Sequence, residues 1–114
     1  MSKINDADMA ELLKEARTYL GITWNDANTD EAIKHFITTS ARRLESVFGG
    51  DLDFVHGEEA YEAIAHELLI SRVFYAREKA LDDFDSNFRG ELLNLRNYGM
   101  IKQMKDRKED AEQQ

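Results

Sequence analysis

The stretch ALDDFDSNFRGELLNLR, from Ala80 to Arg96, decides the fold class. Phe84, Phe88, Leu92 and Leu95 recur in it at steps of four, four and three residues, and this spacing places all four side chains on one face of a helix. Acidic and basic residues surround this apolar stripe. The pattern predicts an amphipathic helix that packs against the rest of the protein on one side only.

No chemical motif accompanies the stripe. His66 and Glu67 begin like the HExxH zinc signature, but Ile70 stands where the second histidine would be. His35, His56 and His66 lie on three separate predicted elements, and we expect each at the surface or at the edge of the core. The serines lack nucleophile-elbow glycines, and no phosphate loop is present. We therefore predict no catalytic, metal-binding or cofactor-binding residue, and a protein that assembles and is not an enzyme.

The composition is typical of one helical domain. The chain has 114 residues, of which 42% are apolar and 33% are charged, with six glycines and no proline. This length suffices for one hydrophobic core, and the absence of proline removes the strongest helix breaker. The absence of cysteine excludes disulfides and thiolate zinc sites. The first residues lack the apolar segment of a secretory signal, and no run approaches the length of a membrane span, so we expect a cytosolic protein without membrane contact.

Apolar spacing and helix-end signals predict an all-α fold, a small bundle of about four helices. The helices are expected at residues 7–20, 30–48, 58–81 and 86–97. Asp6 and Thr29 are the expected N-caps of the first two, and Gly21 and Gly49 follow their ends. The third helix carries apolar residues on more than one side, so we expect it at the centre of the bundle.

Two connections are predicted to interrupt the bundle. Between the third and fourth helices, an acidic cluster at residues 82–85 and Ser86 as a cap candidate predict a break. Between the second and third helices, Leu52 and Phe54 alternate with aspartates in the loop 49–57. This short extended loop has no sheet to join, so we expect the two apolar side chains to anchor it under the helices.

The last residues are predicted to form a separate tail. Gly99 is expected to end the regular structure, which divides the chain into a helical domain at 1–99 and a polar tail at 100–114. Met100 and Ile101 give the tail only a short apolar segment. We expect a tail of this composition to be disordered in the free monomer and able to become ordered on a partner.

The charge distribution disfavours nucleic-acid binding. The formal net charge is −8, and residues 102–114 carry four basic and four acidic side chains, so the charge belongs to the folded body. Such a body repels a phosphate backbone, because nonspecific affinity for DNA comes from lysine and arginine. Ordinary solubility explains the acidity, and so does a channel through which DNA passes without sticking.

Some aromatic residues are expected to be available to a partner. Trp24 lies in a polar loop, where it either closes the corner as a hydrophobic staple or anchors a subunit interface. Phe74, Tyr75, Phe84 and Phe88 are expected mainly in the core. A four-helix domain of this size cannot bury all eleven aromatic side chains of the chain.

Three segments together resemble the small head-to-tail connector proteins of tailed bacteriophages, also called head-completion, adaptor or DNA-packaging proteins. They are YLGITWNDANTDEAIKHFI at 19–37, the helix end and glycines at 47–53, and ALDDFDSNFRGELLNLR at 80–96. The first resembles the family's helix, short aspartate-rich turn and second helix. The last resembles its aromatic and acidic segment, which leads into a closing leucine helix and an arginine. The resemblance covers about the first hundred residues.

The resemblance implies an all-helical structural protein of the virion, with no catalytic residue and no cofactor. Many identical copies would form a dodecamer-like ring below the portal protein after the capsid is filled. The ring would extend the DNA channel and present a docking surface for a stopper or tail-completion protein, and DNA would pass without sequence-specific binding. The protein would lie at the head–tail interface of the virion, and in the host cytoplasm during assembly.

A closed ring needs two different complementary faces on each subunit. We expect the corner near Trp24 and the second or third helix to contribute to the subunit contact, and family behaviour suggests that the segment after Arg96 inserts toward the portal. The candidates for a subunit or portal interface are Trp24, Phe84, Phe88, Arg96, Met100 and Ile101.

Two other functions remain open at the level of sequence. A small acidic helical regulatory or toxin-neutralising protein, which binds one protein partner as a monomer or dimer, would have the same amphipathic helices. A helix-turn-helix regulator of DNA is less favoured, because the body is acidic and no predicted helix is basic enough for recognition.

Overall fold

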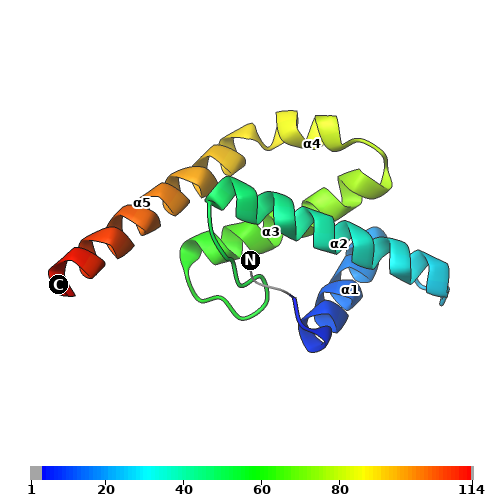
Figure 1. The fold of residues 1–114 in the computed structure, drawn as a ribbon. Coiled ribbons are helices and arrows are strands. Elements are labelled where there is room, and N and C mark those ends of the chain that lie inside the picture. The colour runs from blue at the N-terminus through cyan, green and yellow to red at the C-terminus, as the bar shows by residue number, and fades with distance from the viewer. Residues whose placement is uncertain (1–3, 114) are drawn as a thin grey trace.

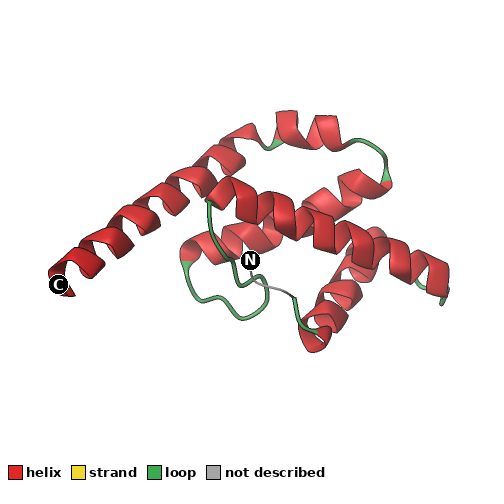
Figure 2. Ribbon diagram, in the orientation of Figure 1, coloured by secondary structure: helices red, strands yellow, loops and turns green. Residues whose placement is uncertain are grey.

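Five helices form the regular structure of residues 4–113, the part of the chain that the computed structural model describes (Figure 1). Their bounds are Asp6–Leu20 (α1), Ala27–Phe48 (α2), Ala60–Arg77 (α3), Leu81–Asn87 (α4) and Arg89–Gln113 (α5). Every regular element among these residues is a helix, and Figure 2 shows only loops between them. The predicted all-α fold is confirmed, with five helices in place of about four.

The ends of α1 and α2 follow local capping chemistry. Gly21 and Gly49 end them in the left-handed conformation, with φ of 72° and 87°, as predicted. The predicted N-caps are wrong. The side chain of Asn5, one residue before Asp6, accepts from the backbone N–H of Asp8 at 2.7 Å. Asp26 caps α2.

Thr29 was predicted to cap α2 because threonine is a common N-cap residue. It lies instead inside the first turn, where its hydroxyl donates to the Asp26 carboxylate at 2.7 Å. Asp26 has the extended backbone that an N-cap requires, and its other carboxylate oxygen accepts from the Asn28 N–H at 3.2 Å. The two hydrogen bonds also lower the pKa of the Asp26 carboxyl, the Thr29 hydroxyl contributing most.

Helix α3 lies at the centre, as predicted, because it packs against each of the other four helices. The core between the helices is apolar and receives side chains from all five. Fully burying one such side chain stabilises the fold by about 1.5–3 kcal/mol. The largest apolar side chains with less than 2% exposure are Leu12, Ile33, Ile37, Leu44, Leu69, Val73, Phe84 and Leu95.

The loop between α2 and α3 is anchored by apolar side chains, as the alternation in its sequence predicts. Leu52 and Phe54 are only 4% and 5% exposed and belong to the core. The loop backbone is held by side chains from both neighbouring helices. Glu45 of α2 accepts from the Leu52 N–H at 2.9 Å, and Glu62 of α3 accepts from the Asp53 N–H at 2.9 Å.

Replacing Glu45 by alanine is expected to lower the free energy of unfolding by about 1–3 kcal/mol, because the buried N–H of Leu52 loses its acceptor. Glu45→Gln keeps a carbonyl oxygen at this position and is expected to cost clearly less. Urea unfolding of the two variants and the wild type measures the difference. Equal losses for both variants would show that the hydrogen bond to Leu52 is not what Glu45 contributes.

A break separates α3 from α4, as predicted, but it lies before the acidic cluster. Helix α3 ends at Arg77, and Lys79 takes a left-handed conformation with φ of 58°. Asp82 and Asp83 then lie in the first turn of α4, where the helix dipole favours negative charge. The acidic residues therefore begin a helix at this point and do not end one.

The apolar stripe of residues 84–95 packs inward, but it spans two helices. Phe84 and Leu95 are fully buried, and Phe88 and Leu92 are partly buried against the same core. Phe88 lies in a turn between α4 and α5, and its N–H still donates to the Phe84 carbonyl at 2.9 Å. This hydrogen bond keeps the helical spacing through the turn, so the stripe stays continuous.

The prediction that regular structure ends at Gly99 is wrong, because α5 continues through this residue to Gln113. Gly99 is buried where α5 crosses the end of α2, and a Cβ atom at Gly99 would overlap the backbone carbonyl of Phe48. One turn later, the side-chain amide of Gln103 donates to the carbonyl of Gly49 at 2.7 Å. The glycine therefore allows two helices to approach closely, and the division into a domain at 1–99 and a tail at 100–114 does not coincide with a helix boundary.

Helix α5 gives the molecule an elongated shape. Its C-terminal half projects away from the other helices (Figure 1), and the molecule measures 55 × 31 × 19 Å. The radius of gyration is 15.4 Å, compared with about 13 Å for a compact chain of this length.

Candidate interaction surfaces

One side of α5 is exposed, partly apolar and basic, and we call it the outer face of α5. Its residues follow one another at steps of three, four or one, so they lie on one side of the helix. The opposite side carries Leu92, Leu95 and Gly99, which pack on the body. The outer face consists of Arg89, Leu93, Arg96, Met100, Ile101, Met104, Arg107 and Lys108, all of them exposed.

Three of the predicted interface residues belong to this face. Arg96 is exposed, and Met100 and Ile101 are 51% and 62% exposed. Leu93 and Met104, which are 54% and 65% exposed, complete the apolar part of the face and were not predicted as interface residues. Leu93 lies seven residues before Met100 and Met104 lies four residues after it, and this helical spacing indicated a common face. It was missed because the residues after Gly99 were expected to be disordered.

The other predicted interface residues lie elsewhere. Phe84 is fully buried, so the prediction that it contacts a partner is wrong for this fold: its ring stacks on Phe88 with centroids 4.8 Å apart. Phe88 is partly buried in the same core. Trp24 is 51% exposed between α1 and α2, and its backbone carbonyl accepts from Arg17 at 2.6 Å. Both interpretations of Trp24, as a staple of this corner and as an interface anchor, stay predictions.

A second surface lies between α1 and α3, and we call it the α1–α3 groove. It has a volume of about 690 Å³ along α1, and a smaller extension of about 330 Å³ continues along α3 past Glu67 and Ile70. Its charged lining consists of Glu11, Glu15 and Glu67 against Lys14 and His66, which pairs with Glu15. The residues that line one part or the other are Glu11, Leu12, Lys14, Glu15, Thr18, Tyr19, Val55, His66, Glu67, Ile70 and Ser71.

Two aromatic rings stand at one end of this groove. Tyr19 of α1 and Phe74 of α3 meet edge to face with centroids 6.0 Å apart, and they are 57% and 38% exposed. From the sequence, Phe74 was expected mainly in the core. Neither side chain belongs to the core. Tyr19 lines both parts of the groove, and Phe74 lies beside it.

His66 lies in the wall of the groove and joins three segments. Its Nδ1 lies 2.6 Å from the Phe54 carbonyl of the loop, and its Nε2 lies 2.6 Å from the Glu15 carboxylate of α1. Both neighbours are acceptors, so the ring satisfies both only when each nitrogen carries a proton. Burial opposes the charge, but the hydrogen bonds to Glu15 and Phe54, with the charges of Glu15 and Glu67, outweigh it and raise the pKa of His66 above its ordinary value.

This arrangement predicts a stability that depends on pH. Because the pKa of His66 is higher in the folded than in the unfolded protein, its charged form stabilises the fold fully below the unfolded value of about 6.5. The contribution is lost as the pH rises through the raised folded pKa. Urea unfolding is expected to show that the free energy of unfolding falls more between pH 6 and pH 8 for the wild type than for His66→Gln. An equal loss in both proteins would contradict the double hydrogen bond.

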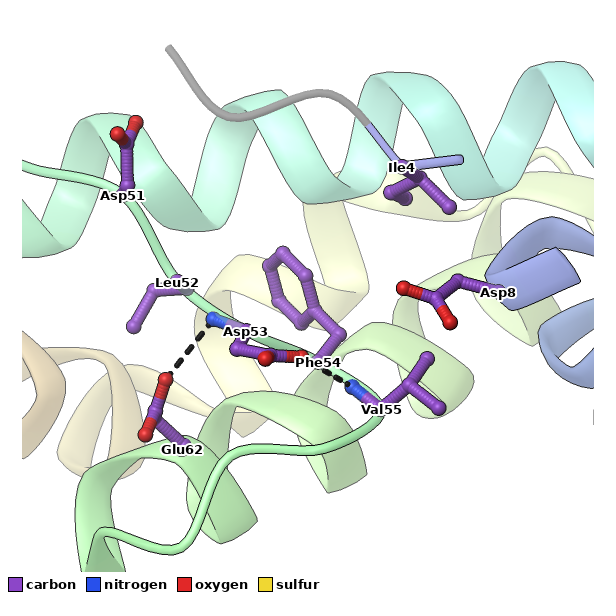
Figure 3. Close-up of a pocket in the computed structure, with 8 residues that line it drawn as sticks. All are labelled: Ile4, Asp8, Asp51, Leu52, Asp53, Phe54, Val55 and Glu62. Atoms are coloured by element: carbon purple, nitrogen blue, oxygen red, sulfur yellow. Dashed lines mark hydrogen bonds between the residues drawn. The ribbon is translucent and has the colours of Figure 1, made fainter. Parts of the chain in front are cut away.

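A third hollow lies between the start of α1 and the α2–α3 loop, and its carboxylates hold the loop (Figure 3). Asp53 accepts from the N–H groups of Val55 and His56 at 3.2 and 2.9 Å, and Asp8 lies 3.0 Å from the His56 ring. The bond from the His56 N–H, against a smaller opposing effect of burial, lowers the pKa of the Asp53 carboxyl. Glu62 accepts from the Asp53 N–H, as Figure 3 shows. These acidic groups serve the loop conformation.

The described residues contain no group of three or more histidine, aspartate or glutamate side chains placed to hold a metal ion. His35, His56 and His66 lie on α2, on the loop and on α3, each at the surface or at the edge of the core, as predicted. Within residues 4–113, no helix is long and apolar enough to cross a membrane.

Searches among protein-family models, curated proteins and solved structures find no match to this chain. The resemblance to phage connector proteins therefore depends on the three sequence segments alone. The exposed surfaces on α5 and between α1 and α3 provide separate evidence about function.

Proposed function

We propose that the protein is a structural component of a tailed-phage virion. In this proposal many copies form a ring below the portal protein, extend the DNA channel, and join the head to the tail after DNA packaging. The observation that carries the proposal is that one small helical chain has two exposed apolar surfaces on different helices. These are the outer face of α5 and the α1–α3 groove.

Two different surfaces are what a ring requires. In a cyclic assembly each subunit contacts the next one head to tail, so one face must complement another face of the same chain. Helices α1 and α5 make no contact with each other in the fold. The two surfaces therefore stay available to different neighbours. Apolar side chains that are more than half exposed, such as Met100 and Met104, are typical of contact surfaces when they gather on one face.

The charge of the body suits a channel for DNA. Residues 1–88 carry nine basic and eighteen acidic side chains, and residues 89–114 carry six and five. An acidic wall does not retain the phosphate backbone, because it offers few cations to displace counterions. In the proposal, DNA passes the ring without sequence-specific binding, and the ring holds the portal on one side and a stopper or tail-completion protein on the other.

Sedimentation at high protein concentration, with and without the portal protein of the same phage, tests the proposal. We expect a large discrete oligomer, or capture of the protein by the portal when the free protein stays monomeric. A monomer or dimer that does not bind the portal would refute the proposed ring and would favour the function of an acidic regulatory protein. Binding to duplex DNA that weakens steeply with salt would favour the DNA regulator.

A further inference from the structure

The outer face of α5 differs in charge from the rest of the molecule. Arg89, Arg96, Arg107 and Lys108 flank its apolar residues, and no acidic side chain is among the described residues on this face. The acidic residues near the end of α5 lie on other sides. Asp106, for example, pairs with Lys102 at 2.8 Å and lines a hollow against the start of α3. An exposed apolar and basic face therefore stands on an otherwise acidic protein.

The α1–α3 groove has the complementary character. Glu11, Glu15 and Glu67 line it, against Lys14 and the ring of His66, which is already bound to Glu15. Tyr19, with Phe74 beside it, provides exposed aromatic surface at one end. The groove is thus apolar with an acidic border, whereas the outer face of α5 is apolar with a basic border.

The dimensions of the two surfaces also agree. The apolar part of the outer face runs from Leu93 to Met104, which is about 17 Å of helix. The groove wall from Glu11 to Tyr19 is about 12 Å long. Two to three turns of a helix therefore fit along the groove. An amphipathic helix laid with its apolar face in a groove is a common mode of recognition between proteins.

We propose that the outer face of α5 of one copy docks in the α1–α3 groove of the next copy. This inference depends on the proposed ring and names the contact that would build it. Since α1 and α5 do not touch within one chain, α5 does not fill its own groove in this fold. Each copy then offers one helix and one groove, and this head-to-tail pairing closes into a ring when its rotation allows closure.

Mixing two variants tests the pairing. Met100→Asp with Met104→Asp disables the outer face and leaves the groove intact, whereas Glu11→Lys with Glu67→Lys reverses the groove charges and leaves α5 intact. We expect each variant alone to associate about tenfold or more weakly than the wild type. The two aspartates place charges in an apolar contact, which is costly, and the two lysines repel the basic border of the outer face. The mixture is expected to form a one-to-one dimer of twice the 13.2 kDa monomer mass and to grow no further.

A control variant adds the same charge elsewhere. Ser46→Asp with Ser86→Asp places two aspartates at exposed positions of α2 and α4, outside both surfaces. It is expected to associate like the wild type. Circular dichroism and thermal melting establish that every variant is folded before its mass is compared.

Disulfide formation gives a second measurement in the presence of the portal. The chain has no cysteine, so a disulfide that forms when Met104→Cys and Tyr19→Cys copies are mixed, and that neither variant forms alone, reports on the contact between these two positions. A disulfide-linked dimer in the portal-bound complex is expected. A portal-bound ring without this disulfide, or a ring that the α5 variant still forms, would overturn the pairing and leave the proposed function intact. If no oligomer forms with or without the portal, both the pairing and the proposed function are refuted. If the α5 variant still forms the ring but no longer binds the portal, the outer face of α5 contacts the portal and not the groove.

Discussion

Replacing Gly99 by alanine is expected to lower the free energy of unfolding by about 3 kcal/mol, at the upper end of the cost of overpacking a core. A methyl group at this position would overlap the backbone carbonyl of Phe48. A backbone atom cannot turn aside as a flexible side chain does, so α5 must move away from α2. That movement also separates Gln103 from the carbonyl of Gly49. Thermal melting and urea unfolding measure the loss.

Gly90 provides the matched control on the same helix. A Cβ atom at Gly90 would meet nothing within 4 Å. Gly90→Ala is therefore expected to raise the free energy of unfolding by about 0.5–1 kcal/mol, through the higher helix propensity of alanine. If both alanine variants were stabilised alike, α5 would not cross α2 at Gly99.

Replacing Phe84 by alanine is expected to cost about 3–5 kcal/mol, the usual range for a large aromatic side chain removed from a core. Phe84 is fully buried, and its ring contacts those of Tyr75 and Phe88 with centroids 5.7 and 4.8 Å apart. Helix α4 has only seven residues, too few to be stable without tertiary packing. Phe84 is its only buried side chain among the described residues, so α4 is expected to lose its position when the ring is removed.

Leu81→Ala, on the same helix, is the control for Phe84→Ala. Leu81 is 36% exposed, so its truncation is expected to cost less than about 1.5 kcal/mol, because little buried volume is lost. Urea unfolding followed by circular dichroism compares the two variants. A loss for Phe84→Ala no larger than that for Leu81→Ala would mean that the stripe does not pack inward.

Much of the fold could be predicted because its signals are local. Gly21 and Gly49 mark helix ends through their own left-handed conformation, and the alternation of Leu52 and Phe54 predicts an anchored loop. The N-caps were misplaced because Asn5 and Asp6 are both good caps, and the sequence does not tell which of them has the extended backbone.

Gly99 was misinterpreted because one residue type serves two purposes. Glycine after an apolar periodic segment is a frequent helix end, and glycine is equally the residue that lets two backbones approach closely. Only the contact with Phe48, which is distant in the sequence, distinguishes the two. The same error assigned Met100 and Ile101 to a tail and hid their place on a continuous helical face.

The candidate surfaces were predictable only in part. Arg96, Met100 and Ile101 are exposed, as interface residues must be. The expected core position of Phe84 is confirmed, but Phe84 was also named as an interface candidate because apolar periodicity describes core and contact surface in the same way. Phe74 was expected inside for the same reason. Which aromatic residues of a wide apolar face point outward depends on how far the neighbouring helix extends over them, and this is a tertiary property.

The crossing of α5 over Phe48 makes the last part of this helix a lever arm with its pivot at Gly99. From Gly99 to Gln113 the arm is about 21 Å long. Among helix pairs of different proteins, crossing angles scatter by about 15–20°. If α5 crossed α2 at an angle that differed by this amount, its tip would lie roughly 5–7 Å away. The geometry of this one backbone contact therefore determines where the tip lies, and in the proposed ring it would set how far from its own body each copy extends its arm.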